Sequence, residues 1–248
     1  MPKYKKKILA GDVYEVEEFY CPRSIGKKYE RGRNENLTSE EQQKRNLNRT
    51  RRELTRIINT NFSGKDIFVL LTHDGVVDLE EARREQSNFF RRLNRYRNRN
   101  GFAPLKYIYV IEMQGRIHHH IVMNQFEGLS MKEMQQIMQE IWGKGLVLIK
   151  HLYKNQKDNR LASYLTKENY KKKGKRWSGS RNLKKPKVTI EIVKETKRKV
   201  KLRAPKNFEI VAAHEDFFEE IGWVRYMKAV RRGGMDYGSY EEGSEDDC

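Results

Sequence analysis

The sequence predicts an α+β protein in which an antiparallel sheet carries helices on one face. Three observations support this: a continuous apolar stretch at 67–72, two strand-like stretches at 107–112 and 117–123 joined by a short glycine-containing connection, and intervening segments with helical apolar periodicity. The resulting order from residue 66 to 170 is strand, helix, strand, strand, helix, strand, helix. That order is typical of ferredoxin-like and RRM-like sheets, a layout that hosts many functions.

Residues 1–65 are expected to form a basic N-terminal extension. Alternating apolar side chains within 1–20 predict a hairpin that turns near Gly11. The Thr-x-x-Glu spacing at 38–41 is a capping box, which predicts the start of a basic helix over 39–59. The extension therefore supplies one hairpin and one helix ahead of the main domain.

Residues 66–187 are expected to form the central domain. Its two long helices are predicted at 79–98, from the recurrence of apolar side chains, and at 130–143, from a second capping box and a terminal glycine. A strand at 146–149 and a helix at about 159–170 complete the domain.

Two further segments follow the central domain. Residues 188–234 are expected to form a β/α subdomain, with strands at 188–193, 200–202 and 208–211 and a helix at 214–226. Residues 235–248 are expected to form an acidic tail.

The charge balance favours a polyanionic partner. The formal net charge is +18, with a pI near 9.8. The tail holds six acidic residues and no Lys or Arg, so the remainder has 52 basic and 28 acidic groups, or +24. Such an excess promotes nucleic-acid binding through counterion release. Charge alone fits a generic RNA-binding or ribosome-associated protein equally well.

Cysteine usage and hydropathy favour a cytoplasmic protein. Cys21 and Cys248 lie far apart and have neither a metal-type spacing nor the pattern of a disulfide framework. No apolar run approaches the ~18 residues of a membrane span, and the basic start lacks the apolar stretch of a signal peptide. We expect no membrane association.

The densest chemical signal is the run Gly-Arg-Ile-His-His-His-Ile-Val at 115–122. Successive side chains on a strand point to opposite faces, so His118 and His120 project together and His119 projects the other way. Two imidazoles at this spacing can bind one metal ion. His119 remains an alternative ligand. The alternative to a metal site is an incidental histidine cluster without a function.

Glu112 is the candidate for a third ligand. It ends the preceding strand, and a hairpin connection would bring it beside the start of the histidine strand. A carboxylate with two imidazoles gives a mixed nitrogen and oxygen site suited to Mn²⁺ or Mg²⁺. A lone hairpin glutamate is more often a solvated surface residue.

A tyrosine and a lysine lie one helical turn apart at Tyr164 and Lys167. A phenol near its usual pKa of ~10 reacts poorly, so it needs a nearby cation, a base or a polarised phosphate. Lys167 supplies a cation. A Tyr-x-x-Lys motif alone is weak, and Tyr170 with Lys173 offers a second pair whose role as another nucleophile stays open.

In this order, Glu112, the pair His118 and His120, and the Tyr-x-x-Lys helix resemble the HUH endonuclease superfamily. The similarity is greatest to replication-associated proteins of rolling-circle plasmids and phages, whose first motif is an apolar strand ending in Leu-Thr, here 68–72. The resemblance covers about 66–187 and implies an HUH endonuclease fold. The histidine at the middle position departs from the usual aliphatic residue.

The resemblance implies a reaction and its participants. Tyr164 would attack a scissile phosphate of single-stranded origin DNA, assisted by Lys167 and by a divalent metal held at Glu112, His118 and His120. The resemblance implies the cytoplasm of a bacterial host cell, where host polymerase would extend the released 3′-OH. A host helicase would unwind the template, since no nucleotide-binding Gly-rich Lys loop occurs in the chain.

Basic residues after the tyrosine helix are expected to follow a DNA strand. Lys171 to Lys187 contains nine basic residues, no acid and one tryptophan, a composition that suits backbone contacts with base stacking. The alternative to a DNA-binding segment is a solvated lysine loop that contacts no partner. The residues expected to contact DNA are Arg116, Lys171, Lys173, Arg176, Trp177, Arg181, Lys184 and Lys185.

Two other functions fit parts of this pattern. An HUH-type transposase or relaxase would use the same chemistry. A non-catalytic RRM-like nucleic-acid-binding protein would share the sheet, but its sheet would need exposed aromatics, and the first strand at 68–72 lacks that pattern. Such a binder also does not need two histidines on one face. A metal-dependent DNA-cleavage assay separates the enzyme from the binder.

Overall fold

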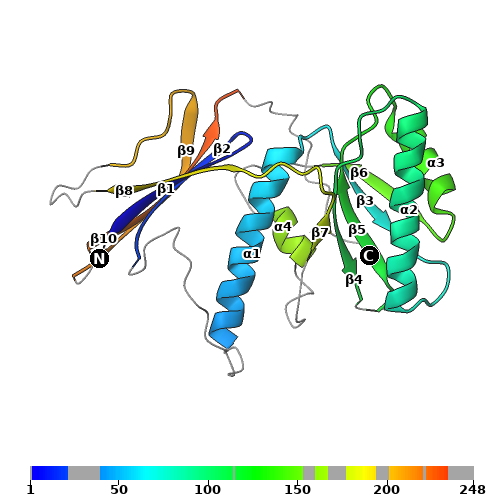
Figure 1. The fold of residues 1–248 in the computed structure, drawn as a ribbon, viewed down its shortest axis with the longest axis horizontal. Helices are drawn as coiled ribbons and strands as arrows, with labels where there is room; N and C mark the ends of the chain where they lie inside the picture. The colour runs from blue at the N-terminus through cyan, green and yellow to red at the C-terminus, as the bar shows by residue number, and fades with distance from the viewer. Residues whose placement is uncertain are drawn as a thin grey trace, which may run out of the picture.

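The computed structural model describes residues 2–21, 40–113, 115–152, 160–166, 177–193, 201–219 and 222–233. In the described residues, two five-stranded antiparallel sheets lie on either side of the helices α1 (Glu40–Asn61) and α4 (Arg160–Thr166) (Figure 1). The helices α2 (Leu79–Arg99) and α3 (Met131–Trp142) cover the outer face of one sheet. No described helix has the length and apolar content needed to cross a membrane.

The central sheet confirms the expected α+β class. Its strands are β3 (Ile67–Leu71), β4 (Tyr107–Glu112), β5 (His118–Met123), β6 (Val147–His151) and β7 (Ser178–Gly179). They lie in the order β6-β3-β5-β4-β7, with every neighbouring pair antiparallel. The first four form the ferredoxin-like arrangement, and β7 extends it at the β4 edge.

Each face of the central sheet has its own apolar core. On one face, alternate residues of β3 and β5 pack against α2 and α3, with Phe89 and Trp142 among the fully buried side chains. On the other face, Ile108 and Val122 pack against Leu54 of α1 and the described part of α4. A sheet covered on both faces explains why β3 reads as a continuous apolar run instead of an alternating one.

Local signals set the ends of the helices. Asp78 accepts a hydrogen bond from the backbone N–H of Glu81 at the start of α2. The capping box of Ser130 and Glu133 is present at the start of α3, and Gly143 ends that helix in the left-handed conformation. Both features stabilise helix ends by supplying partners for otherwise unsatisfied backbone groups.

The second sheet combines strands from the two ends of the sequence. It contains β1 (Lys3–Ala10), β2 (Val13–Tyr20), β8 (Lys187–Val193), β9 (Phe208–Phe218) and β10 (Gly222–Arg231). Their order is β8-β1-β2-β10-β9. The expected N-terminal hairpin is confirmed, and Gly11 at its turn has a φ of 59°, which glycine adopts without strain. The residues before and after the central domain thus form one structural unit.

The prediction of a helix at 214–226 is wrong. Within this range, residues 214–218 belong to β9 and residues 222–226 to β10, an antiparallel pair in which Tyr226 opposes His214. The stretch favours a helix locally, but Arg225 to Val230 pair with β2, whose position in the sequence is remote. That long-range pairing outweighs local propensity. The described part of the strand expected at 200–202 has no regular secondary structure.

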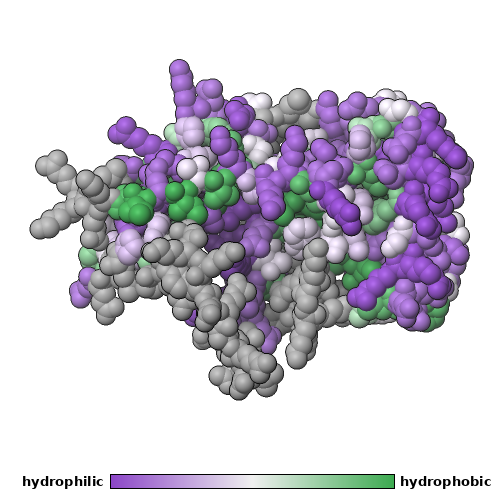
Figure 2. Space-filling model, viewed as in Figure 1, coloured by the Kyte–Doolittle hydropathy of each residue, from purple (hydrophilic) through white to green (hydrophobic). Residues whose placement is uncertain are grey.

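The strand β8 forms an apolar edge of the second sheet. Val188, Ile190 and Ile192 alternate along it and are all exposed, and a row of hydrophobic side chains lies over β8 in Figure 2. Hydrophilic side chains cover most of the visible surface around α2.

A buried ion pair connects the second sheet to α1. The guanidinium of Arg56 donates from Nε to Glu15 Oε2 at 3.0 Å and from Nη2 to Glu17 Oε1 at 2.6 Å. The side chains of Arg56 and Glu15 are only 10% and 8% exposed. Because α1 also packs on the central sheet, this contact sets the position of one sheet relative to the other.

Replacement of Arg56 by alanine should lower the free energy of unfolding by about 3–5 kcal/mol, because it leaves the buried carboxylate of Glu15 without its cation. Arg49→Ala on the same helix is the matched control. It removes an exposed pair with Glu53 and should cost less than about 1 kcal/mol. Urea denaturation of the two variants measures the difference. Equal midpoints would show that the Arg56 contact does not hold the sheets together.

Candidate active site

The hairpin of β4 and β5 places three polar side chains on one face of the central sheet. Glu112 lies directly opposite His118, and Val110 lies opposite His120. Residues that oppose each other in an antiparallel pair share a face, as do residues two apart on one strand. Glu112, His118 and His120 therefore project to the same side, the side covered by α1 and α4.

His120 and Glu112 are in direct contact. His120 Nε2 and Glu112 Oε2 form a hydrogen bond whose donor depends on the imidazole tautomer. The side chain of His120 is 6% exposed and that of Glu112 is 24% exposed, so the pair stands where the hairpin opens to solvent. The ring of Phe68 packs 5.9 Å from the His120 ring and forms an apolar wall beside it.

The helix α4 lies on the same face. Its Ala162 and Leu165 are buried in the cluster that also contains Ile108 and Val110 of β4. Tyr164 is on this helix, but its side chain is outside the part of the chain that the structure describes, and Lys167 and Tyr170 also lie outside the described residues. The structure thus brings the tyrosine helix, the carboxylate and the two imidazoles to one face.

His119 points to the opposite face and is fully buried. Its Nε2 lies 2.8 Å from Nε2 of His73, and both rings contact Trp142. Burial, with the neighbouring histidines, lowers the pKa of His119 to about 3, and burial also lowers the pKa of His73. Both imidazoles are therefore neutral near pH 7.

The environment of His119 selects one tautomer. Among the described residues, its buried Nδ1 has no hydrogen-bond partner. A buried N–H donor without an acceptor costs more than an unused lone pair, so the proton belongs on Nε2, which donates to His73 Nε2. His119 is thus a packing residue that fixes β5 on its far side, and the strand then presents His118 and His120 to the other.

Thr72, the threonine of the Leu-Thr pair after β3, connects three elements through hydrogen bonds. Its hydroxyl accepts from the N–H of Leu146 at 3.0 Å, its own N–H donates to the Leu146 carbonyl at 3.0 Å, and its carbonyl accepts from Trp142 Nε1 at 2.7 Å. These bonds join β3 to the start of β6 and to α3. They also fix the next residue, His73, against His119.

The donor set at Glu112, His118 and His120 is chemically suited to a divalent metal. Imidazole nitrogen with carboxylate oxygen is a combination that Mn²⁺ accepts, and a hard oxygen also suits Mg²⁺. Within the described ranges, however, no three His, Cys, Asp or Glu side chains converge as a metal-binding group. The structure therefore provides one contacting pair, Glu112 and His120, with His118 directly across the ladder.

Of the residues expected to contact DNA, those that the structure describes lie at the β4–β5 turn and around β7, at one edge of the central sheet. Arg116 is exposed at the β4–β5 turn, and Lys184 and Lys185 are exposed after β7. Lys184 is anchored through its backbone, since its N–H donates to Asn61 Oδ1 at 2.7 Å and its carbonyl accepts from Asn61 Nδ2 at 2.8 Å. Trp177 is half-buried against the core on the His120 face. Lys171, Lys173 and Arg176 lie outside the described residues.

Two features of this region were not foreseen from the sequence. The pairing of His73 with His119 joins the segment after β3 to β5, and a single histidine after a Leu-Thr pair gives no indication of such a contact. Tyr107 and Tyr109 alternate on β4 with Glu112 on the opposite face, and that alternation could have indicated an aromatic surface behind the candidate site.

Comparison with known proteins gives one match. Residues 66–173 match the model of the family described as "Replication-associated protein ORF2/G2P". The matched span contains Glu112, His118, His120 and Tyr164. No curated protein and no solved structure matches the chain. The central part of the chain is thus similar to replication-associated proteins.

Proposed function

We propose, from this similarity to replication-associated proteins, that the protein initiates rolling-circle replication of a plasmid or phage by nicking single-stranded origin DNA through a tyrosine. The observation that carries the proposal is the shared face of the central sheet. Glu112, His118, His120 and the helix that contains Tyr164 all lie on it, although they come from three separate elements. An enzyme is favoured over a non-catalytic binder because packing alone does not require two imidazoles and a carboxylate on one partly open face.

Glu112, His118 and His120 would hold the metal. When bound, Mn²⁺ or Mg²⁺ would polarise the scissile phosphate and offset the charge that develops on its oxygens in the transition state. The contact between His120 Nε2 and Glu112 Oε2 keeps the two donors side by side. The buried His119–His73 pair holds β5 in the register that this arrangement needs.

Tyr164 would act as the nucleophile and Lys167 would favour its phenolate. The phenolic oxygen, having lost its proton, bonds to phosphorus, and the bond from phosphorus to the 3′ oxygen breaks. That oxygen takes up a proton and leaves as a 3′-OH, while the 5′ end of the DNA remains on the tyrosine. Attack by a later 3′-OH on the phosphotyrosyl bond reverses the chemistry and rejoins the strand.

The single-stranded DNA would enter along basic side chains next to the hairpin. Arg116 stands at the β4–β5 turn, and Lys184 and Lys185 follow β7 at the edge of the same sheet. Cationic groups around the sheet edge would neutralise the phosphates on both sides of the scissile bond. The backbone anchoring of Lys184 by Asn61 keeps this part of the path close to α1.

A covalent-adduct assay tests the proposal. The purified protein is incubated with end-labelled single-stranded DNA from a candidate origin region, with Mn²⁺, with Mg²⁺ or with EDTA, and the products are separated under denaturing conditions. We expect a protein–DNA adduct and a free 3′-OH fragment with either metal and neither product with EDTA. DNA binding without cleavage under every condition would favour the non-catalytic binder instead.

A further inference from the structure

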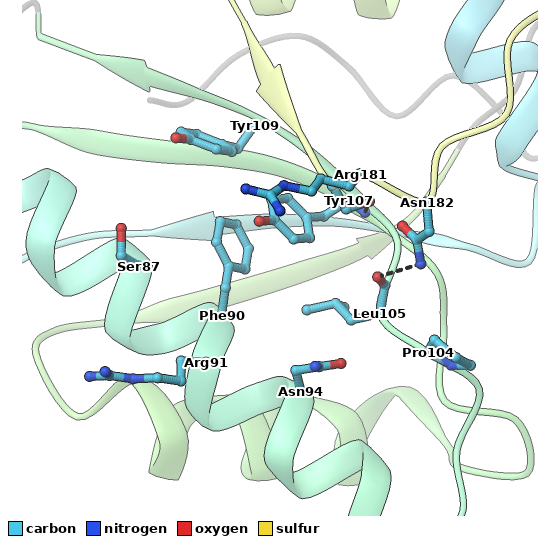
Figure 3. Close-up of a pocket in the computed structure, with 11 residues that line it drawn as sticks. Ser87, Phe90, Arg91, Asn94, Pro104, Leu105, Tyr107, Tyr109, Arg181 and Asn182 are labelled. Atoms are coloured by element: carbon cyan, nitrogen blue, oxygen red, sulfur yellow. Dashed lines mark hydrogen bonds between the residues drawn. The ribbon is translucent and has the colours of Figure 1, made fainter.

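A pocket of about 520 Å³ opens on the α2 side of the central sheet, behind the candidate active site. The pocket is lined by residues of α2, of β4 and the segment before it, and of the turn after β7 (Figure 3). Its volume is in the range of small-molecule and nucleotide sites. The replication chemistry proposed above makes no use of it.

Three aromatic rings form the inner wall. Phe90 and Tyr107 are stacked, with centroids 3.7 Å apart and planes inclined by 15°. Tyr109 stands further out, 5.5 Å from Phe90 and 6.1 Å from Tyr107. Phe90 is buried, whereas Tyr107 and Tyr109 remain partly exposed toward the opening. In Figure 3, Phe90 and Tyr107 lie close together and Tyr109 is set apart from them, and all three rings line the pocket.

The charge of the pocket is positive. Arg91 comes from α2 and Arg181 from the turn after β7, and none of the described lining residues is acidic. Both arginines are exposed, and the Arg181 guanidinium extends over the aromatic wall in Figure 3. The turn is rigidly placed, because Asn182 Nδ2 donates to the Leu105 carbonyl at 3.1 Å and the Ser180 N–H donates to the Tyr107 carbonyl at 2.9 Å.

The position of the pocket connects it to the proposed DNA path. Trp177 packs on the face that holds His120, whereas Ser180 and Arg181, a few residues further, line the pocket on the other face. The segment therefore passes around the β7 edge of the central sheet. A DNA strand that follows these basic residues reaches the pocket after leaving the candidate active site.

We propose that the pocket binds one unpaired nucleotide of single-stranded DNA, with its base stacked on Tyr109 and its phosphates paired with Arg181 and Arg91. This inference rests on the proposed action on single-stranded DNA and adds a second contact point, remote from the scissile phosphate. An aromatic wall recognises any base through its flat face, and a duplex cannot present a base in that way. The pocket thus selects unpaired DNA.

Fluorescence anisotropy in EDTA, where cleavage does not interfere, measures the affinity for a labelled 20-nucleotide strand and for the corresponding duplex. Tyr109→Leu, which keeps apolar volume but removes the ring, should weaken binding of the single strand by about 5- to 100-fold, the usual effect of one base–aromatic stack. Its affinity for the duplex should change by less than about twofold. Arg181→Gln should weaken binding of both DNA forms, because phosphates are present in each.

Two matched variants provide controls outside the pocket. Tyr96→Leu removes an aromatic ring that packs on the same core, and Arg99→Gln removes an exposed positive charge from the end of α2. Neither residue lines the pocket, so both variants should bind the single strand like the wild type. A Tyr109→Leu protein that binds it as tightly as Tyr96→Leu overturns the proposal.

Photocrosslinking of the wild-type protein supplies a measurement that needs no variant. A strand containing 5-iodouracil should form an adduct on Tyr107 or Tyr109, mapped by mass spectrometry. Adducts confined to other peptides overturn the proposal, even if the covalent-adduct assay succeeds. An adduct at these tyrosines without metal-dependent cleavage supports nucleotide binding in the pocket and refutes the proposed nuclease activity. Failure of the wild type to bind the single strand refutes both proposals.

Discussion

Replacement of Tyr164 by phenylalanine should abolish the covalent protein–DNA adduct and the nicked product together. The phenolic oxygen is the atom proposed to bond to phosphorus, and phenylalanine lacks it while keeping the ring. Removal of a nucleophile from a serine protease costs about 10⁶ in rate, so a loss of at least about 10⁴-fold is expected. Quantification of adduct and of free 3′-OH fragment over time in Mn²⁺ measures the effect.

Tyr170→Phe is the matched comparison, since Tyr170 is followed by Lys173 in the same spacing. It should retain the adduct, and circular dichroism of both variants should match that of the wild type. The assignment to Tyr164 is refuted if Tyr164→Phe still forms the adduct and peptide mapping places it on Tyr170. A partial loss in both variants would indicate two nucleophiles.

His118→Ala and His120→Ala should each reduce metal-dependent cleavage by at least about 100-fold. Loss of an outer-shell partner of a metal ligand already costs 10- to 100-fold, and loss of a ligand is expected to cost more. Glu112→Gln should weaken Mn²⁺ binding or shift the preference between Mn²⁺ and Mg²⁺, because it replaces a charged oxygen donor by a neutral amide. Calorimetric titration with each metal measures binding separately from cleavage.

His119→Gln is the control for the metal register. The amide of glutamine can donate to His73 Nε2 as the imidazole does, so the strand should keep its place while the ring is lost. We expect wild-type metal affinity in this variant. His119→Ala is unsuited to the comparison, because His119 is fully buried and its truncation leaves a cavity. Loss of metal binding in His119→Gln, with retention in His118→Ala and His120→Ala, would contradict the register.

The central sheet could be predicted from the sequence because its signals are local. The apolar run of β3, the glycine-containing turn between β4 and β5, and the Ser130 capping box each define an element without reference to distant residues. The direction of the histidine side chains follows from the period of two along a strand. For this reason the faces of His118, His119 and His120 could be assigned before the structure was known.

The second sheet could not be predicted in the same way. Residues 214–226 favour a helix when taken alone, but residues 214–218 pair with β10, and β10 in turn pairs with β2 from Arg225 onward. The partner of a strand depends on tertiary contacts that no short window of sequence contains. The aromatic pocket is hidden for a similar reason, since Phe90, Tyr109 and Arg181 come from three elements that are distant in sequence.

The composition of the second sheet has a consequence for how the protein matures on the ribosome. The inner pair of β2 and β10 joins strands separated by roughly 200 residues, with the whole central domain between them. At a synthesis rate of 5–20 residues per second, β10 emerges roughly 10–40 s after β2. The central domain has time to fold in this interval. Until β8 and β10 are synthesised, both outer edges of the β1–β2 hairpin remain unpaired, and an isolated hairpin is only marginally stable. The central domain would then be assembled first, and closure of the second sheet would be the slow final step of folding.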